Sequence, residues 1–424
     1  MSRPSSGVSA EFSLARLLQP LSVETFLDGI WAETHHHIKR GCPGYFDGLL
    51  PGPSTVDELL ELFHGEPSAV RLVKGSDKKG SDNYRLLDGS LDIDGILDDF
   101  ADGYTIVFDG VEQYVRAVGT LARSIEVELN FPIQVNTYIT PPGQTGLAPH
   151  YDDHDVLILQ VQGSKIWHLY VGVDRPPREL QREKEKAVDA DGLPTPTDVC
   201  LEAGDVLYVP RGRVHSAETT SEQSIHLTVG IHAPTVLMLA IGALYSQSWR
   251  DDRLNARLPV RHLDDADLDT TLRSLVREAV GTVDDSGAMA GGLELLADVL
   301  VRRGRCPPVG PIANAAGIDG ETLVRKYQPL YSWVRTEPSG VTLQFASLSV
   351  GAGPDHKAAM EFVSRSTEAF RVGDLPALSE RQQVELARSL IVSGFLVRLP
   401  YDADGAGQRE IRRDRRGGEG GEHG

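Results

Sequence analysis

Two stretches of the chain contain side chains able to hold a transition metal together. In the first, PHYDDHDVLILQVQGSKIWHLY (149–170), His150 and Asp152 are two residues apart. A strand with this spacing would place both side chains on one face. The second stretch, GDVLYVPRGRVH (204–215), ends at His215. Two histidines and one carboxylate on one side of a metal are typical of non-haem Fe(II), which keeps its remaining coordination positions open.

An HxD pair alone is weak support for a metal site, because a strand with two polar residues on its solvent face has the same pattern. Here the pair is followed by two apolar strands around a turn at Gly163, and then by Gly204-Asp205 and Pro210-Arg-Gly before His215. This order predicts that the sheet returns and carries His215 to the same cavity. We therefore favour the metal site over a solvated strand face.

The residues that must position this site form short β-rich segments separated by glycine and proline turns. Segment 133–140 alternates, with Asn136, Tyr138 and Thr140 on one face. Further strands are expected at 155–162, 165–171, 199–201, 205–209, 214–217 and 224–232. This density of short strands predicts a mainly β core, either a sandwich or a jelly roll.

Helices with one apolar face precede this core and are expected to pack on its outside. They cover 13–31, with Ser22 as the N-cap of a second helix, and then 54–63 and 111–129. A charged, proline-rich insertion at 174–198 is expected to be an exposed loop near the mouth of the site.

The chain is expected to have four regions. These are a catalytic domain with its N-terminal helices (1–234), a helical dimerisation region (235–310), a small winged-helix-like domain (319–400) and a disordered tail (402–424). Val236 to Trp249 is apolar all round, as in a helix buried against another element or another subunit, and the second case would make the protein a homodimer. Within 319–400 we expect helices at 323–327, 355–364 and 379–393, and β structure at 341–348.

The composition excludes several classes of protein. A net charge of −19 argues against direct DNA binding, and it suits either a basic partner or solubility alone. The three cysteines show no metal-binding or disulfide spacing, which predicts a reducing, cytoplasmic location. The N-terminus has no apolar stretch like that of a signal peptide, and the longest apolar run, 236–245, is shorter than the roughly 20 residues that span a bilayer.

Three further histidines, His168, His226 and His232, are interpreted as interior residues of strands rather than metal ligands, whereas His154 could reach the rim of the site. His226 shares a strand face with Thr228, which would place it behind the site. Asp153 would either orient ligands or substrate, or face solvent.

The motifs taken together resemble the cupin-type, JmjC-related Fe(II)/2-oxoglutarate oxygenases, specifically the ribosomal oxygenase family. The matching residues span the catalytic half densely, and the resemblance implies that the mainly β catalytic core is a cupin-like double-stranded β-helix, a form of jelly roll. They are SVETF (22–26) through Trp31, NTY (136–138), TPPGQ (140–144), HYDD (150–153), LQ (159–160), GSKIW (163–167), GDVLYVP (204–210) and His215. After residue 234 only the order of elements agrees with that family.

The resemblance implies roles for the metal-binding side chains and for one lysine. His150, Asp152 and His215 match the iron ligands of the family. Lys165 would pair with the distal carboxylate of 2-oxoglutarate as a point charge. Without the resemblance, Lys165 is better explained as a solvated turn lysine.

Three more residues match positions that help to line the cosubstrate pocket, namely Asn136, Tyr138 and Thr228. Asn136 and Tyr138 share a strand face, so both can point into one cavity. Tyr138 is explained equally well as a core aromatic residue whose hydroxyl has a partner, and Thr228 as an ordinary strand residue.

The expected activity is that of a protein hydroxylase. Fe(II) would bind 2-oxoglutarate and O₂, and a histidine or arginine side chain of a basic, ribosomal protein would be hydroxylated. The resemblance further implies that a lysine at position 165, rather than an arginine, favours histidine as the hydroxylated residue. One alternative is the same chemistry on a free amino acid, a peptide or a biosynthetic intermediate. Another is a non-catalytic metal-binding cupin that acts as a sensor or scaffold.

Overall fold

The computed structural model describes residues 12–50, 55–175, 188–189, 191–284, 286–306 and 317–399. The chain divides into two compact units, Met1–Leu300 and Val301–Gly424. The expected tail at 402–424 and residues 176–187 of the expected loop lie outside the described residues. The four-region division of the sequence stays a prediction.

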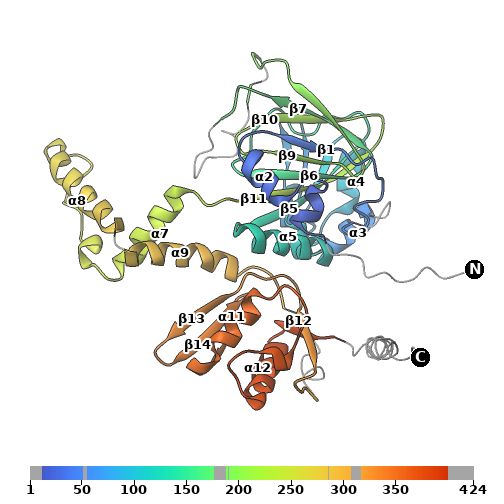
Figure 1. Cartoon of the computed structure of the whole chain (residues 1–424). Helices are drawn as coiled ribbons and strands as arrows, with labels where there is room; N and C mark the ends of the chain where they lie inside the picture. The colour runs from blue at the N-terminus through green and yellow to red at the C-terminus, as the bar shows by residue number, and fades with distance from the viewer. Residues whose placement is uncertain are drawn as a thin grey trace, which may run out of the picture. The chain divides into compact units, whose positions relative to one another are not determined.

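Two antiparallel sheets form the core of the first unit (Figure 1). In spatial order, the larger sheet contains β1 (His36–Ile38), β9 (Val206–Val209), β6 (Asp155–Gln162), β11 (Ser224–Ile231), β5 (Ile133–Thr140), β4 (Thr105–Phe108), β2 (Val70–Lys74) and β3 (Asp77–Lys79). The smaller sheet contains β10 (Val214–Thr219), β7 (Ser164–Tyr170) and β8 (Thr197–Glu202). The predicted jelly-roll core is confirmed.

Alternation along the strands gives each sheet two different faces. In β7 the residues Lys165, Trp167 and Leu169 are buried, whereas their neighbours along the strand are half-buried. Trp167 and Leu169 pack with Ile158 of β6 in an apolar cluster between the sheets. Lys165 therefore projects from the same face as two core residues.

Helices cover the other face of the larger sheet. They are α1 (Leu14–Leu18), α2 (Val23–Gly29), α3 (Thr55–Leu62), α4 (Ile93–Ala101) and α5 (Arg116–Leu129). The side chain of Ser22 accepts a hydrogen bond from the Thr25 amide, so it caps α2 as predicted. Leu121 and Ile125 of α5 are fully buried in one cluster with Val135 of β5. This packing holds β5 rigidly, with its other face toward the cavity.

In the described part of the first unit, the β core is followed by the α-helices α7 (Val236–Ser248), α8 (Asp269–Gly281) and α9 (Ser286–Val301, which ends at the unit boundary). A Cβ added to Gly292 would lie 2.9 Å from the Ala243 amide nitrogen, so the backbones of α9 and α7 are in direct contact. Ile241 and Trp249 are nevertheless 57% and 79% exposed, although both are large and apolar. Among the described residues, no helix is long and apolar enough to cross a membrane.

Among its described residues, the second unit has two small sheets and two α-helices. Its elements are β12 (Leu323–Lys326), β13 (Trp333–Glu337), β14 (Gly340–Phe345), β15 (Leu348–Ala352), α11 (Lys357–Arg365), β16 (Phe370–Arg371), α12 (Glu380–Val392) and β17 (Leu396–Arg398). The predicted helix at 323–327 is wrong, because this segment is β12, which pairs with β16 and β17. The partners come from far along the chain, so the local pattern could not reveal them. The winged-helix assignment stays a prediction.

Candidate metal and cosubstrate site

His150 and Asp152 lie in the connection between β5 and β6, not in a regular strand as predicted. His150 makes one isolated antiparallel bridge with His215 of β10. In this bridge the His150 amide donates to the His215 carbonyl at 3.0 Å, and the His215 amide donates to the His150 carbonyl at 2.8 Å. On either side of the bridge there are single hydrogen bonds rather than a regular ladder, from the Gly146 amide to the Ala217 carbonyl and from the Gly212 amide to the Asp152 carbonyl.

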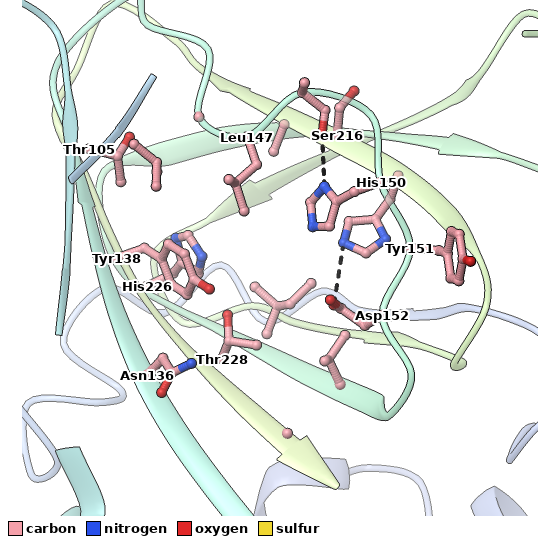
Figure 2. Close-up of a pocket in the computed structure, with 18 of the residues that line it drawn as sticks. Thr105, Asn136, Tyr138, Leu147, His150, Tyr151, Asp152, Ser216, His226 and Thr228 are labelled. Atoms are coloured by element: carbon pink, nitrogen blue, oxygen red, sulfur yellow. Dashed lines mark hydrogen bonds and ion pairs between the residues drawn. The ribbon is translucent and has the colours of Figure 1, made fainter. Parts of the chain in front are cut away.

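The structure brings the three predicted ligands together. One ligand atom from each of His150, Asp152 and His215 lies within 4.8 Å of the others. Nε2 of His215 is 3.7 Å from a carboxylate oxygen of Asp152. Figure 2 shows the side chains of His150 and Asp152 on the same side of the cavity. The sequence therefore predicted the right cluster of ligands, although residues 150–152 do not form the regular strand on which that prediction was based.

Both imidazole rings are held in the tautomer that a metal requires. Nδ1 of His150 lies 2.8 Å from the Ala148 carbonyl oxygen, and Nδ1 of His215 lies 2.9 Å from the Arg213 carbonyl oxygen. A carbonyl only accepts, so each Nδ1 must carry the hydrogen. Each Nε2 therefore keeps its lone pair for a metal. Burial lowers the pKa of His215 to about 4, which keeps this ring neutral and able to coordinate.

Lys165 is only 3% exposed, so its alternative interpretation as a solvated turn lysine is wrong. Its ammonium donates to Oγ1 of Thr140 at 3.0 Å, and Thr140 Oγ1 also accepts from Thr105 Oγ1 at 3.1 Å. Within the described chain, Lys165 forms no ion pair with a carboxylate. Burial lowers its pKa to about 7. A buried ammonium without a counter-ion indicates that a ligand supplies the negative charge.

Arg71 of β2 also lines the cavity, but its charge is already balanced. Its guanidinium donates to both carboxylate oxygens of Asp109, at 2.8 and 3.1 Å. Sequence reasoning did not single out this ion pair, because the two residues come from different segments and neither has a motif. Arg71 thus has a carboxylate partner, whereas Lys165 has none among the described residues. Lys165 is therefore the cation that is available to an anionic ligand.

The wall opposite the metal cluster comes from two neighbouring strands of the larger sheet. Asn136 and Tyr138 of β5 pair in register with Thr228 and His226 of β11. The Tyr138 and His226 rings are stacked at 4.9 Å between centroids and 3° between planes. Figure 2 shows these four side chains directed into the cavity. The structure thus places all three predicted pocket residues on this wall.

Two buried polar atoms on this cavity have no hydrogen-bond partner in the described part of the chain: Nε1 of Trp167 and Nδ1 of His226. Together with Lys165 they give the lining of the cavity polar groups that a ligand could bind. The cavity has a volume of about 1030 Å³, enough for a small dicarboxylate and part of a second molecule.

Two more residues of the site, Thr105 and Thr140, were not predicted. The alternation of 133–140 did place Thr140 on the face shared by Asn136 and Tyr138, so a signal for it existed in the sequence. Thr105 had no such signal, because it comes to Thr140 only through the pairing of β4 with β5.

Comparison with known proteins agrees with this geometry. The family model described as "JmjC domain" matches residues 115–239, which include all three candidate ligands. The chain contains a JmjC domain. The resemblance stated from the sequence motifs is thereby confirmed.

Relatives of this JmjC protein include two animal proteins. The bifunctional lysine-specific demethylase and histidyl-hydroxylase NO66 of Drosophila mojavensis is 32% identical over 221 residues, which are 51% of this chain and 24% of that protein. Ribosomal oxygenase 2 of Rattus norvegicus is 31% identical over 301 residues, which are 68% of this chain and 60% of that protein. The chain thus spans about a quarter of the first relative and less than two thirds of the second.

Solved structures of the ribosomal oxygenase YcfD from Escherichia coli have the same fold as this JmjC protein. One has a TM-score of 0.56 at 19% identity, covering 89% of this chain and 98% of that one. Another, in complex with cobalt and 2-oxoglutarate, has a TM-score of 0.56 at 19% identity, covering 90% and 99%. At this level of identity the likeness establishes the fold.

Proposed function

We propose that this chain is an Fe(II)- and 2-oxoglutarate-dependent dioxygenase that hydroxylates an amino-acid side chain of a protein. The observation that carries the proposal is the uncompensated buried ammonium of Lys165 in the cavity of a His-Asp-His cluster. A metal alone would explain the cluster, but it would not explain a buried cation that needs an anion. A dicarboxylate that also binds the metal explains both.

The chain's own residues would hold the reactants in place. His150, Asp152 and His215 would hold Fe(II) through two Nε2 atoms and a carboxylate. Lys165 would bind the distal carboxylate of 2-oxoglutarate, while Thr140 orients the ammonium. Bound iron supplies the activation of O₂, in which one oxygen atom enters succinate as CO₂ is released and the other enters the substrate C–H bond.

The proposed substrate is a histidine or arginine side chain of a ribosomal protein. The printed names of the relatives, histidyl-hydroxylase and ribosomal oxygenase, support this class. The net charge of −19 suits a basic ribosomal segment, because complementary charge favours the encounter. As the resemblance implies, a lysine rather than an arginine at position 165 favours histidine over arginine as the hydroxylated residue. A cytoplasmic location, expected from the cysteine pattern, would place the enzyme with its substrate.

Succinate formation tests the chemistry without knowledge of the substrate. The purified protein is incubated with Fe(II), 2-oxoglutarate and O₂, with and without ribosomal protein. We expect succinate in the complete mixture and none when Fe(II) is omitted. A non-catalytic metal-binding cupin would bind Fe(II) but form no succinate in any mixture.

Comparative mass spectrometry tests the substrate. Ribosomal proteins from a strain that lacks this gene are compared with those from the parent strain. We expect one peptide of the parent to be heavier by one oxygen atom, at a histidine or arginine. If no ribosomal protein differs while succinate still forms, the substrate is instead a free amino acid, another peptide or a biosynthetic intermediate.

We also propose that α7 contributes to a homodimer. Exposed apolar side chains of this helix and of its C-cap residue, among them Ile241 and Trp249, support a contact with a second copy. Ile241→Glu should therefore give a monomer by light scattering. Leu87→Glu, which changes an exposed leucine in the connection between β3 and α4, is the matched control and should leave the mass unchanged. Direct DNA binding is not expected, because the chain is acidic.

A further inference from the structure

Two histidines outside the metal cluster form a stacked pair at one side of the cavity. His154 precedes β6 and His232 follows β11, and their ring centroids are 4.4 Å apart with 28° between the planes. The ring of His154 lies directly over Gly230 of β11, because a Cβ added there would be 2.8 Å from the His154 Cδ2 atom. Glycine at this position therefore lets the imidazole pack against the strand backbone.

The stacked pair lies where the large cavity meets a second, smaller one. The second cavity has a volume of about 270 Å³, and Asp153 and His232 line both cavities. Its lining combines apolar side chains, among them Met238 of α7 and Leu296 of α9, with polar ones such as Arg211. It is therefore a mixed site next to the proposed reaction centre, with room for one side chain.

We propose that a polypeptide substrate crosses the His154–His232 pair, with its target side chain in the large cavity and a neighbouring aliphatic side chain in the small one. Asp153, which has one carboxylate oxygen 3.0 Å from Nδ1 of His154, would accept a hydrogen bond from a peptide amide, and Arg211 would donate to a peptide carbonyl. A free amino acid would fill the large cavity alone and would leave the second cavity without a role. The inference rests on the proposed function and deepens it, since it selects a polypeptide over a free amino acid.

The test is a binding selection that needs no turnover. The full chain, with Co(II) in place of iron and with 2-oxoglutarate, is exposed to short random peptides that carry a fixed central histidine or arginine. Bound peptides are eluted and sequenced. We expect leucine, isoleucine or methionine to be enriched about tenfold at one position next to the centre, as follows from burial of one aliphatic side chain.

Two variants on the same helix locate the preference. Leu296→Trp fills the small cavity and should abolish the enrichment, whereas Leu295→Trp adds the same group to an adjacent residue that does not line the cavity and should preserve it. Peptides that bind without any preference beside the centre, or a preference that Leu296→Trp leaves unchanged, would overturn the inference. Light scattering on each variant verifies that its mass is that of the wild type.

Binding of cosubstrate separates this inference from the proposed function. If the protein with Co(II) fails to bind 2-oxoglutarate, the proposed function fails and the peptide site falls with it. If 2-oxoglutarate binds and succinate forms with Fe(II), but only free amino acids are bound and oxidised, the peptide site alone is rejected.

Discussion

The ammonium nitrogen of Lys165 lies 3.0 Å from the hydroxyl oxygen of Thr140, its one hydrogen-bond partner in the described part of the chain. An ammonium group has three hydrogens to donate, so this contact leaves two of them for a ligand. The pair joins the smaller sheet, through β7, to the larger sheet, through β5. It thereby fixes where a carboxylate can be bound relative to the metal cluster.

Lys165→Met should weaken the binding of 2-oxoglutarate without affecting that of the metal. Loss of a charge-assisted contact to a buried carboxylate should raise the KM for 2-oxoglutarate by about 10- to 100-fold. Steady-state succinate formation measures this KM, and metal titration measures the affinity for Fe(II). Lys326→Met is the matched control, since Lys326 is a half-buried lysine of the second unit whose pKa burial also lowers. An unchanged KM in Lys165→Met would remove the lysine from the cosubstrate site.

Thr140→Val should have a smaller effect in the same direction. The methyl group preserves the shape of the side chain but removes the acceptor of the Lys165 ammonium. The KM for 2-oxoglutarate should therefore rise by about 3- to 10-fold, as expected for one hydrogen bond. Thr137→Val on the other face of β5 is the control, because Oγ1 of Thr137 is buried and has no partner among the described residues. Equal effects of the two substitutions would mean that strand packing, rather than the contact with Lys165, determines the KM.

The sequence was sufficient to predict the site residues that belong to a motif or that lie on one face of an alternating strand. It predicted the three candidate ligands, Lys165, and the shared face of Asn136 and Tyr138. It failed where the structure depends on pairing between distant segments. The ion pair of Arg71 with Asp109 joins two segments 38 residues apart, and no local pattern marks either one.

Errors of local structure have the same origin. The pattern at 150–152 predicted a strand, but the single bridge from His150 to His215 is enough to bring the ligands together without one. The pattern at 323–327 was too short to distinguish a helix from a strand, because the partners of β12 lie at 370–371 and 396–398. Tertiary pairing, rather than local propensity, decided both segments.

Asp152→Ala should abolish metal binding and turnover. Two imidazoles without the carboxylate lose both a ligand and the negative charge that balances the cation. Metal content after dialysis, measured by mass spectrometry, should fall to background, and succinate formation should stop. Asp153→Ala removes the adjacent carboxylate, which belongs to the proposed peptide site, and should retain the metal. Retention of one equivalent of iron by Asp152→Ala would show that another residue completes the cluster.

Binding of 2-oxoglutarate should weaken as pH rises above about 7. Burial lowers the pKa of Lys165 to about 7 in the free protein, so the ammonium is charged below this pH and becomes neutral above it. Only the charged form offers a counter-ion to the distal carboxylate, so above pH 7 binding must also take up a proton. The apparent Kd should then increase about tenfold per pH unit until the pKa of Lys165 in the complex is reached.

Isothermal titration of the metal-loaded protein, in buffers of different ionisation enthalpy, measures both the Kd and the proton uptake. Lys165→Met should bind weakly but show neither change with pH in this range. A Kd of the wild type that stays constant from pH 6 to 9, without proton uptake, would mean that Lys165 does not bind the cosubstrate in its charged form.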